Sequence, residues 1–388
     1  MTGSGNILIV FPHNFFERKS GVNKRYFELV CYLKEKGYSI DLLGLKHFES
    51  KWKTFARDNS NNLINQLFLY NFRIGFNKQR LMSLLSTLSF SKKRNNLLPK
   101  NQLPDYAFPG MLSLFNRIVT NKKYDYIIIG YVYWANLLRD NILQDSVSVL
   151  TIEDFISPKL IETNGPSFDF TLSAKEEVER VNLFDRVICL SFEELQFFSA
   201  RTQHPEYYYV PVFLKDPHLV SRRKEYDMMF IGFDNADNKD GLEWFFKQVY
   251  PLLNKALKII LTGKIARFAP DLPNVIKIDY ADDVSEIYAR SKISINPLQK
   301  GTGMKVKVIE SLAYGIPIVN TSKGLCGMPP DILNQFITAD DPQNFADEIH
   351  HLIMDEKWYH EKCRDAKTLF LEKFEYNSVK NELNKLFS

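Results

Sequence analysis

The sequence predicts an α/β protein made of two Rossmann-like doubly wound domains that face each other across a cleft. Short apolar segments alternate with longer amphipathic segments along most of the 388 residues. A polar stretch at 214–225 interrupts this alternation, which then starts again. Several apolar segments are rich in Ile and Val without polar alternation, which is typical of parallel strands covered by helices on both faces. In such sheets, ligands bind at the carboxyl ends of the strands.

The first domain is expected at 1–213, with a parallel sheet of seven strands. The strands are predicted at 6–10, 38–43, 66–71, 125–131, 146–152, 185–190 and 206–212. Amphipathic segments between them predict helices at 21–36, 111–120, 134–143, 172–182 and 192–201. The first apolar run is too short for a signal peptide, so it is expected to be a buried strand.

The second domain is expected at 226–372, after a linker at 214–225. Its strands are predicted at 226–231, 257–262, 275–278, 292–296, 316–320 and 335–338. Its helices are predicted at 241–253, 284–289, 304–314, 342–354 and 357–372. A last amphipathic helix at 378–387 belongs to a C-terminal segment, 373–388, which we expect to pack back on the first domain.

Composition indicates a globular protein and excludes several other classes. Apolar residues make up 45% and charged residues 25%, which excludes a disordered chain, a collagen-like repeat and a disulfide scaffold. The four cysteines are scattered without a CxxC pair, as in a cytoplasmic protein with reduced thiols. No apolar stretch reaches the length of about 18 residues that a membrane-spanning helix needs. We therefore expect a cytoplasmic protein.

The net charge of +4 conceals a strong division along the chain. Residues 1–125 hold 20 basic and 8 acidic residues, a local charge of +12, and the remainder carries −8. Within the basic part, residues 64–94 combine an apolar stretch with flanking basic residues, which suits an anionic membrane surface. A core helix with solvated ends is an equally good interpretation. Nucleic-acid binding is not expected, because no known reader motif is present.

The most informative segment, 296–321, has the pattern strand, Gly-rich turn, helix, Gly stop and strand. Gly301 and Gly303 permit a close approach of the backbone to a ligand. The turn ends at a helix N-terminus, which favours an anion such as a diphosphate, and Lys305 and Lys307 add positive charge there. Glu310, further along the helix, suits a pair of ribose hydroxyls. The spacing alone also occurs in many α/β proteins without this function, and it matches neither GxGxxG nor the phosphate loop.

This segment closely resembles the donor-binding motif of retaining glycosyltransferases of family four, which have the two-domain GT-B fold. The helix of that motif reads roughly K-x-x-E-A-x-A-x-G-x-P-V-V, and residues 307–319 read KVIESLAYGIPIV. Weaker resemblances follow the family's order along the chain, at 20–25, 177–191, 230–245 and 279–298. The resemblance therefore covers essentially the whole chain.

The resemblance implies a nucleotide-diphospho-sugar donor that binds to the second domain. Glu310 matches the second Glu of the family's motif and would bind the donor ribose. Thr302 stands where the family has the first Glu, so the contact to the donor sugar would differ here. The residues expected to bind the donor are Gly232, Lys264, Gly301, Thr302, Gly303, Met304, Lys305, Lys307 and Glu310.

In the first domain, the run 151–154 stands where the family often has a His that faces the donor sugar. Glu153 takes the place of that His, and Asp154 is kept. Carboxylates at the carboxyl end of a strand are reasonable acid or base groups, so Asp154 and Glu153 are the expected catalytic residues. A helix cap or a loop carboxylate is the alternative for Asp154. The residues expected to bind acceptor or phosphate, or else to be exposed loop charges, are His13, Glu17, Gly21, Lys24 and Arg25.

The predicted function is transfer of a sugar from a nucleotide-diphospho-sugar to a saccharide or lipid-linked acceptor, in the synthesis of bacterial capsule or lipopolysaccharide. The resemblance implies retention of configuration. A helix dipole and lysines stabilise a departing diphosphate without a metal, so we expect no metal and no cofactor beyond the co-substrate. Two alternatives stay open, a non-catalytic nucleotide- or sugar-binding protein and a sugar-nucleotide epimerase. Peripheral attachment to the inner face of the plasma membrane is a further expectation.

Overall fold

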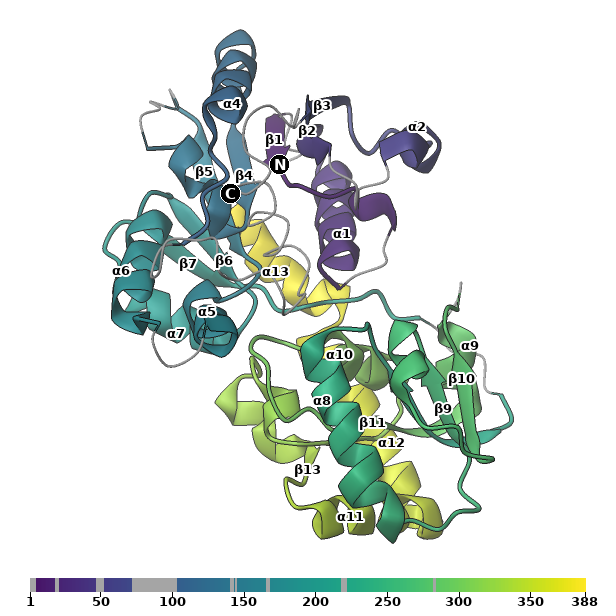
Figure 1. Ribbon diagram of the computed structural model, residues 1–388. Coiled ribbons are helices and arrows are strands. Elements are labelled where there is room, and N and C mark those ends of the chain that lie inside the picture. Colours follow the sequence, from purple (N-terminus) through teal and green to yellow (C-terminus); the bar gives the residue numbers. More distant parts are fainter. Residues whose placement is uncertain are drawn as a thin grey trace. The chain divides into compact units, whose positions relative to one another are not determined.

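The computed structural model describes residues 5–17, 21–46, 52–71, 103–139, 143, 145–164, 168–217, 222–281 and 284–388. These residues form two compact units, Met1–Tyr209 and Val210–Ser388 (Figure 1). Each unit contains one parallel sheet with helices packed on it. The predicted fold class, two Rossmann-like doubly wound units, is confirmed.

The first unit is built on a seven-stranded parallel sheet in the order β3-β2-β1-β4-β5-β6-β7. The order runs outward from β1 in both directions, which places the switch point between β1 and β4. All seven predicted strands are present, and β1 and β4 are almost wholly buried. The strands are β1 (Asn6–Val10), β2 (Ser39–Lys46), β3 (Gln66–Asn71), β4 (Tyr126–Gly130), β5 (Val147–Ile152), β6 (Arg186–Cys189) and β7 (Glu206–Tyr209).

The helices of this unit include two, α2 and α5, that the sequence did not predict. The α-helices are α1 (Gly21–Glu35), α2 (Phe55–Asp58), α4 (Pro109–Asn121), α5 (Ile156–Asn164), α6 (Phe170–Val181) and α7 (Phe192–Ser199). A 3₁₀ helix, Val132–Leu137, replaces the helix predicted at 134–143, of which residues 140–142 lie outside the described residues. Four of its six residues are buried, so the segment lacks the solvated face that an amphipathic α-helix requires.

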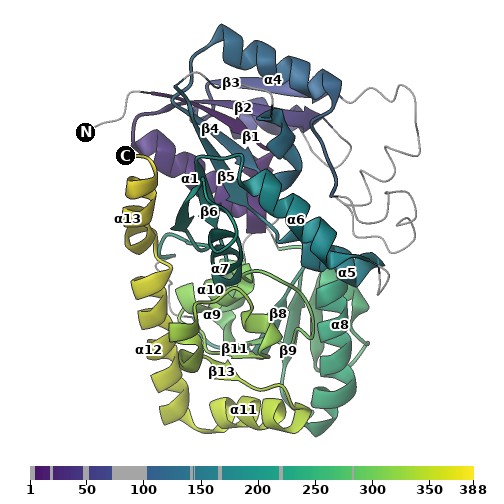
Figure 2. The same ribbon diagram turned by 90° about the vertical axis from the view of Figure 1, so that its left-hand side faces the viewer.

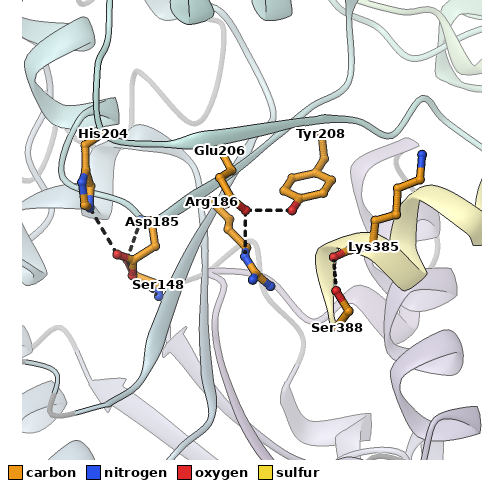
Figure 3. A network of polar contacts seen from close by, with 8 residues as sticks. All are labelled: Ser148, Asp185, Arg186, His204, Glu206, Tyr208, Lys385 and Ser388. Carbon is orange, nitrogen blue, oxygen red and sulfur yellow. Dashed lines mark hydrogen bonds and ion pairs between the residues drawn. The ribbon is translucent and has the colours of Figure 1, made fainter. Parts of the chain in front are cut away.

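Polar contacts tie together the amino ends of β5, β6 and β7, which is the edge opposite the predicted ligand edge (Figure 3). Asp185 accepts hydrogen bonds of 2.7 Å from both the backbone N and Oγ of Ser148, and its other oxygen lies 3.2 Å from His204 Nε2. Arg186 pairs with Glu206 at 3.5 Å. These contacts fix the register of the three strands and leave their carboxyl ends to carry other side chains.

The second unit is built on a six-stranded parallel sheet in the order β10-β9-β8-β11-β12-β13. Its switch point lies between β8 and β11. The strands are β8 (Tyr226–Ile231), β9 (Ile259–Thr262), β10 (Val275–Ile278), β11 (Ser291–Asn296), β12 (Ile318–Asn320) and β13 (Ile337–Thr338), at or within the predicted segments to one residue.

Helices cover both faces of this sheet. Along β8, Met228 and Phe230 pack with residues of α8 and α11, whereas Met229 between them packs with residues of α9 on the opposite face (Figure 2). This alternation is the period of two that a strand imposes on its side chains. The helices are α8 (Ala236–Trp244), α9 (Ser285–Arg290), α10 (Val306–Ala313), α11 (Pro342–Met354), α12 (Glu356–Lys373) and α13 (Tyr376–Leu386).

The C-terminal helix α13 is attached to the second unit at its start. Leu214 forms a parallel bridge with Glu375, with its N bonded to the Phe374 carbonyl oxygen and its own carbonyl oxygen bonded to Tyr376 N, both at 3.0 Å. The Glu375 side chain caps the helix by accepting from Asn377 N. The packing of 373–388 on the first domain stays a prediction.

Candidate functional site

The loop between β11 and α10 is shaped by glycines in left-handed conformations. Gly301 has a φ of +112° and Gly303 a φ of +69°. Gly327, with a φ of +92°, packs against this loop so closely that a Cβ there would lie 2.5 Å from the Met304 backbone N. Residues with side chains rarely adopt these conformations. The Gly-rich turn expected from the sequence is therefore present, just before the N-terminus of α10.

Lys305 holds this turn together. Its Nζ donates to the carbonyl oxygens of Thr302, at 2.7 Å, and of Gly303, at 2.9 Å. Lys305 is also the N-cap residue of α10. Its positive charge therefore lies on the turn that leads into the helix N-terminus, the end of a helix where an anion is favoured. The sequence predicted a cation at this place but not its role in shaping the turn.

Lys307 lies in the first turn of α10 and is held by a second loop. Its Nζ donates to Asn238 Oδ1 at 2.7 Å and lies 4.2 Å from the centre of the Phe230 ring. Burial, and to a lesser extent the positive charge of Lys305, lower the pKa of Lys307 to about 7, while Glu310 and Asp237 oppose the shift. A small change in the local charge therefore decides whether this lysine is a cation.

Glu310 is buried on the inner side of α10, with only 6% of its surface exposed. Its Oε2 accepts a hydrogen bond of 3.2 Å from the hydroxyl of Tyr288 on α9. The Tyr288 ring stacks on Tyr314, with ring centres 4.5 Å apart. The carboxylate predicted to bind the ribose therefore has a fixed position, which these two rings define.

The other predicted donor residues follow β8 and β9. Gly232 N donates to the Thr262 carbonyl oxygen at 3.0 Å, and the exposed Lys264 Nζ lies 4.7 Å from the centre of the Phe233 ring. Asn238 links this loop to the Gly-rich turn, because its Nδ2 donates to the Phe233 carbonyl oxygen at 2.9 Å while its Oδ1 accepts from Lys307. The structure thus brings the two groups of predicted residues together.

Thr302 takes the place of the first Glu of the family motif. Its Oγ1 is buried and has no hydrogen-bond partner among the residues that the structure describes. A buried hydroxyl without a partner costs free energy, about 1–3 kcal/mol, unless a ligand or water completes it. This observation agrees with the expectation that the hydroxyl and the backbone of the turn face a bound group.

In the first unit, Glu153 follows β5 and forms a buried ion pair with Arg25 of α1. Burial raises the pKa of Glu153, and Arg25 opposes that shift. Glu153 Oε2 and Arg25 Nε have no partner among the described residues. An ion pair this deeply buried fixes both side chains in place, since removing one partner would leave an uncompensated charge.

Asp154 is the more accessible of the two predicted acid/base groups. Its side chain is 32% exposed and forms an ion pair with Lys159 of α5. The catalytic role predicted for Asp154 and Glu153 stays a prediction. Their geometry favours Asp154, because Glu153 is enclosed by protein.

The predicted acceptor or phosphate ligands lie along the β1–α1 connection. His13 follows β1, with its ring 5.7 Å from that of Phe11, and Glu17 ends the 3₁₀ helix Phe15–Glu17. Gly21 begins α1, and Lys24 lies in its first turn, next to Arg25. All lie at the carboxyl end of β1, and Arg25 forms the buried ion pair with Glu153.

Sequence reasoning missed the partners of these residues. Asn238 and Phe230 hold Lys307, Tyr288 holds Glu310, and Lys159 holds Asp154. Each partner except Lys159 comes from an element distant in the sequence, so no local spacing reveals it. Lys159 lies five residues after Asp154, and that short spacing was an available signal.

The expectations about a membrane surface and about metal ions can be compared only with the described part of the chain. Of the predicted membrane-facing segment 64–94, residues 72–94 lie outside the described residues, and 66–71 form β3. Among the described helices, none has both the length and the apolar character needed to cross a bilayer. Within the same residues, no three His, Cys, Asp or Glu side chains are grouped so that they could hold a metal ion.

Comparison with known proteins gives three kinds of similarity. Residues 225–355 match the family model of glycosyl transferases group 1. An uncharacterized 44.6 kDa protein in the cps region of Klebsiella pneumoniae is 22% identical over 302 residues, which cover 71% of this chain and 76% of that protein. The matched family segment contains both the Gly-rich turn and α10.

Solved structures with the same fold align over almost the whole chain. Sucrose-phosphate synthase from Thermosynechococcus elongatus has a TM-score of 0.69 at 12% identity and covers 99% of this chain and 98% of its own. The S. aureus TarM G117R mutant in complex with Fondaparinux, alpha-GlcNAc-glycerol and UDP has a TM-score of 0.67 at 13% identity, with 99% and 100% covered.

The fold and the family match agree on one assignment. The two parallel-sheet units are those of GT-B glycosyltransferases, and the Gly-rich turn and Glu310 lie inside the segment that the family model covers. The chain therefore has the fold of GT-B glycosyltransferases, and its second unit contains the segment that matches the family model of glycosyl transferases group 1.

Proposed function

We propose that this chain is a glycosyltransferase that moves a sugar from a nucleotide-diphospho-sugar to a saccharide or lipid-linked acceptor during synthesis of a bacterial surface polysaccharide. One observation carries the proposal. The Gly-rich turn 301–305 leads directly into α10, where Lys305, Lys307 and the buried Glu310 lie together. This arrangement offers N–H groups and cations to a diphosphate and a carboxylate to a ribose.

Two of the similarities support the biological setting. The Klebsiella pneumoniae relative is encoded in a cps region, which favours capsule synthesis. The TarM structure contains UDP together with saccharides, which favours a UDP-sugar as donor and a saccharide as acceptor. Lipopolysaccharide synthesis, a location on the cytoplasmic side and peripheral membrane attachment are part of the proposal on the basis of the sequence alone.

The proposed chemistry needs charge stabilisation of the leaving diphosphate. The α10 dipole and the adjacent lysines supply it from the protein itself, and we propose transfer without a metal ion on that basis. Retention of configuration is proposed from the family resemblance. Thr302, in place of the first motif Glu, would offer a hydroxyl rather than a carboxylate to the donor sugar.

The test begins with thermal shift of the full chain in UDP, GDP, ADP, UDP-glucose and UDP-N-acetylglucosamine. We expect stabilisation by at least one nucleotide sugar, followed by release of its nucleotide diphosphate. Glu310→Ala should weaken donor binding by about tenfold or more, equivalent to about 1.4 kcal/mol, because the ribose loses its carboxylate partner. Glu372→Ala, at an exposed position of α12, is the matched control and should bind as the wild type does.

Three outcomes separate the proposal from its alternatives. Wild-type binding and turnover in Glu310→Ala would show that the site is elsewhere. Binding of nucleotide sugars without release of nucleotide would favour the non-catalytic binding protein. Conversion of the sugar nucleotide without any acceptor would favour an epimerase.

A further inference from the structure

Glu177 of α6 is a buried carboxylate that the donor and acceptor assignments leave without a role. It belongs to the run 177–191 that resembles the family, and only 1% of its surface is exposed. Within the described residues, its hydrogen bonds go to the start of α5. Oε1 accepts from Ile156 N at 2.8 Å, and Oε2 accepts from Ser157 N at 2.9 Å and from Ser157 Oγ at 2.6 Å.

These bonds cap α5 from outside the helix. An N-cap side chain ordinarily comes from the residue just before the helix. Here the carboxylate comes from another helix, 20 and 21 residues further along the chain. A negative charge at this end of a helix is favourable, and Ser157 is itself fully buried, so water does not compete for these bonds.

The cap fixes the connection that carries the predicted acid/base groups. Only residues 153–155 separate the end of β5 from the start of α5. Asp154, in this connection, pairs with Lys159, which lies on α5 itself. The position of Asp154 therefore depends on α5, and the position of α5 depends on Glu177.

We propose that Glu177 is a positioning residue for the transfer reaction, which fixes α5 and, through Lys159, orients Asp154 for the acceptor step. This inference rests on the proposed function, because it requires a glycosyl transfer in which Asp154 acts on the acceptor. Glu153, on the other side of the same connection, is held independently by Arg25 of α1. The connection is thus held by two separate charged contacts.

Keeping Glu177 charged in the protein interior costs free energy, and capping α5 alone does not explain that cost. Burial raises its pKa to about 7, although the hydrogen bonds from Ser157 and Ile156 and the nearby Arg180 favour the charged form. Tyr133, from the 3₁₀ helix, also faces this group, and the carboxylate contributes to the raised pKa of that hydroxyl. Protonation would turn one acceptor oxygen into a donor facing N–H and O–H donors, and the cap would loosen.

The raised pKa of Glu177 lets an experiment distinguish a positioning role from a purely stabilising role. A carboxyl whose folded pKa is raised from 4.5 to about 7 binds a proton more readily in the folded state. Acidification between these values therefore does not unfold the chain through this group. The transfer rate should nevertheless fall as pH decreases through about 7, because the connection that holds Asp154 loosens.

The experiment compares Glu177→Gln with Glu179→Gln in the full chain. Glu179 is exposed on the same helix, so its variant is the matched control. In Glu177→Gln we expect amide exchange at Ile156 and Ser157 to rise by about tenfold or more, because the amide cannot accept all three bonds. The rate of UDP release from UDP-glucose should fall by about tenfold. UDP affinity should not change, and the acidic limb of the pH profile should disappear.

Two results would overturn the inference. One is unchanged exchange at Ile156 and Ser157 in Glu177→Gln, and the other is a wild-type rate and pH profile despite faster exchange. If Glu177→Gln does not fold, Ser157→Ala removes one of the three bonds and should give the same changes in smaller measure. A wild type that binds UDP but turns over no donor would contradict the proposed function instead, and the exchange measurement would still decide whether the cap exists.

Discussion

At the scale of single residues, burial lowers the pKa of Lys307 so far that its neutral form is populated near pH 7. With a pKa of about 7, it is protonated below that pH and largely neutral above it. If Lys307 binds the diphosphate, donor affinity should weaken as pH rises through 7, approaching about tenfold per pH unit. Calorimetry with UDP-glucose between pH 6 and 8.5 measures this, since both of its phosphates are diesters that do not titrate in that range.

Substitutions distinguish Lys307 from the other lysines near the turn. Lys307→Met keeps the length of the side chain over Phe230 but removes the charge, so its affinity should be low and independent of pH. Lys264→Met removes an exposed cation and should keep the wild-type pH dependence. A pH dependence that survives in Lys307→Met would assign the titration to another group.

The sequence predicted the Gly-rich turn and its helix better than it predicted the contacts that hold their side chains. Gly301, Gly303, Lys305, Lys307 and Glu310 are adjacent in the chain, and the turn and helix that they form obey local rules. The groups that set their charge and orientation, Asn238 and Tyr288, come from other elements. The pKa of Lys307 depends on burial by those elements, which no motif encodes.

At the scale of elements, the Gly-rich turn depends on a second loop that carries Gly327. A Cβ at Gly327 would lie 2.5 Å from Met304 N, and its φ of +92° is unfavourable for other residues. Gly327→Ala should therefore push the turn out of place. We expect a loss of about 1–3 kcal/mol in the free energy of unfolding and a further loss of donor affinity, measured by urea denaturation and UDP titration.

Gly315 provides the matched control for this prediction. It also has a positive φ, +62°, but the nearest atoms to an added Cβ there are 3.7 Å away. Gly315→Ala should therefore cost only backbone strain, about 1 kcal/mol, and leave UDP affinity unchanged. Equal donor binding by both variants would show that the contact between Gly327 and Met304 does not shape the site.

Elements were predictable where a local pattern decides them. The apolar runs that form β1, β4 and β8 are buried because helices cover them, and such runs are stable only where they are shielded from water. The helix expected at 134–143 is replaced by a 3₁₀ helix in which Val132, Trp134, Ala135 and Leu137 are all buried, so the segment has no solvated face. α5 was missed because its cap, Glu177, lies on another helix.

At the scale of the whole molecule, the division of charge falls within the first unit and not between the two units. Residues 1–125, with a local charge of +12, and residues 126–209, with −7, both lie in the first unit, so the second unit is nearly neutral, with 24 basic and 25 acidic residues. The proposed donor site would therefore have to attract a diphosphate within a nearly neutral unit. In this proposal Lys305 and Lys307 supply the positive charge at close range, whereas more distant charges are screened.

The basic charge of the first unit is then available for another anionic surface, and we expect that surface to be a membrane. Lys92, Lys93 and Arg94 end the predicted segment, and each basic residue near an anionic leaflet contributes about 1 kcal/mol. Flotation with phosphatidylglycerol vesicles at low salt should recover the protein, and neutral phosphatidylcholine vesicles should not. Replacing all three with Gln should weaken binding on the order of a hundredfold.

A control with the same change in charge separates position from net charge. Lys255, Lys323 and Lys357 are exposed lysines of the second unit, and replacing them with Gln should leave vesicle binding unchanged. Equal losses in both triple variants would mean that only net charge matters. Negligible binding of the wild type to either vesicle would instead favour a core helix in the uncharged stretch at 81–90, because a buried apolar stretch offers no surface to lipid.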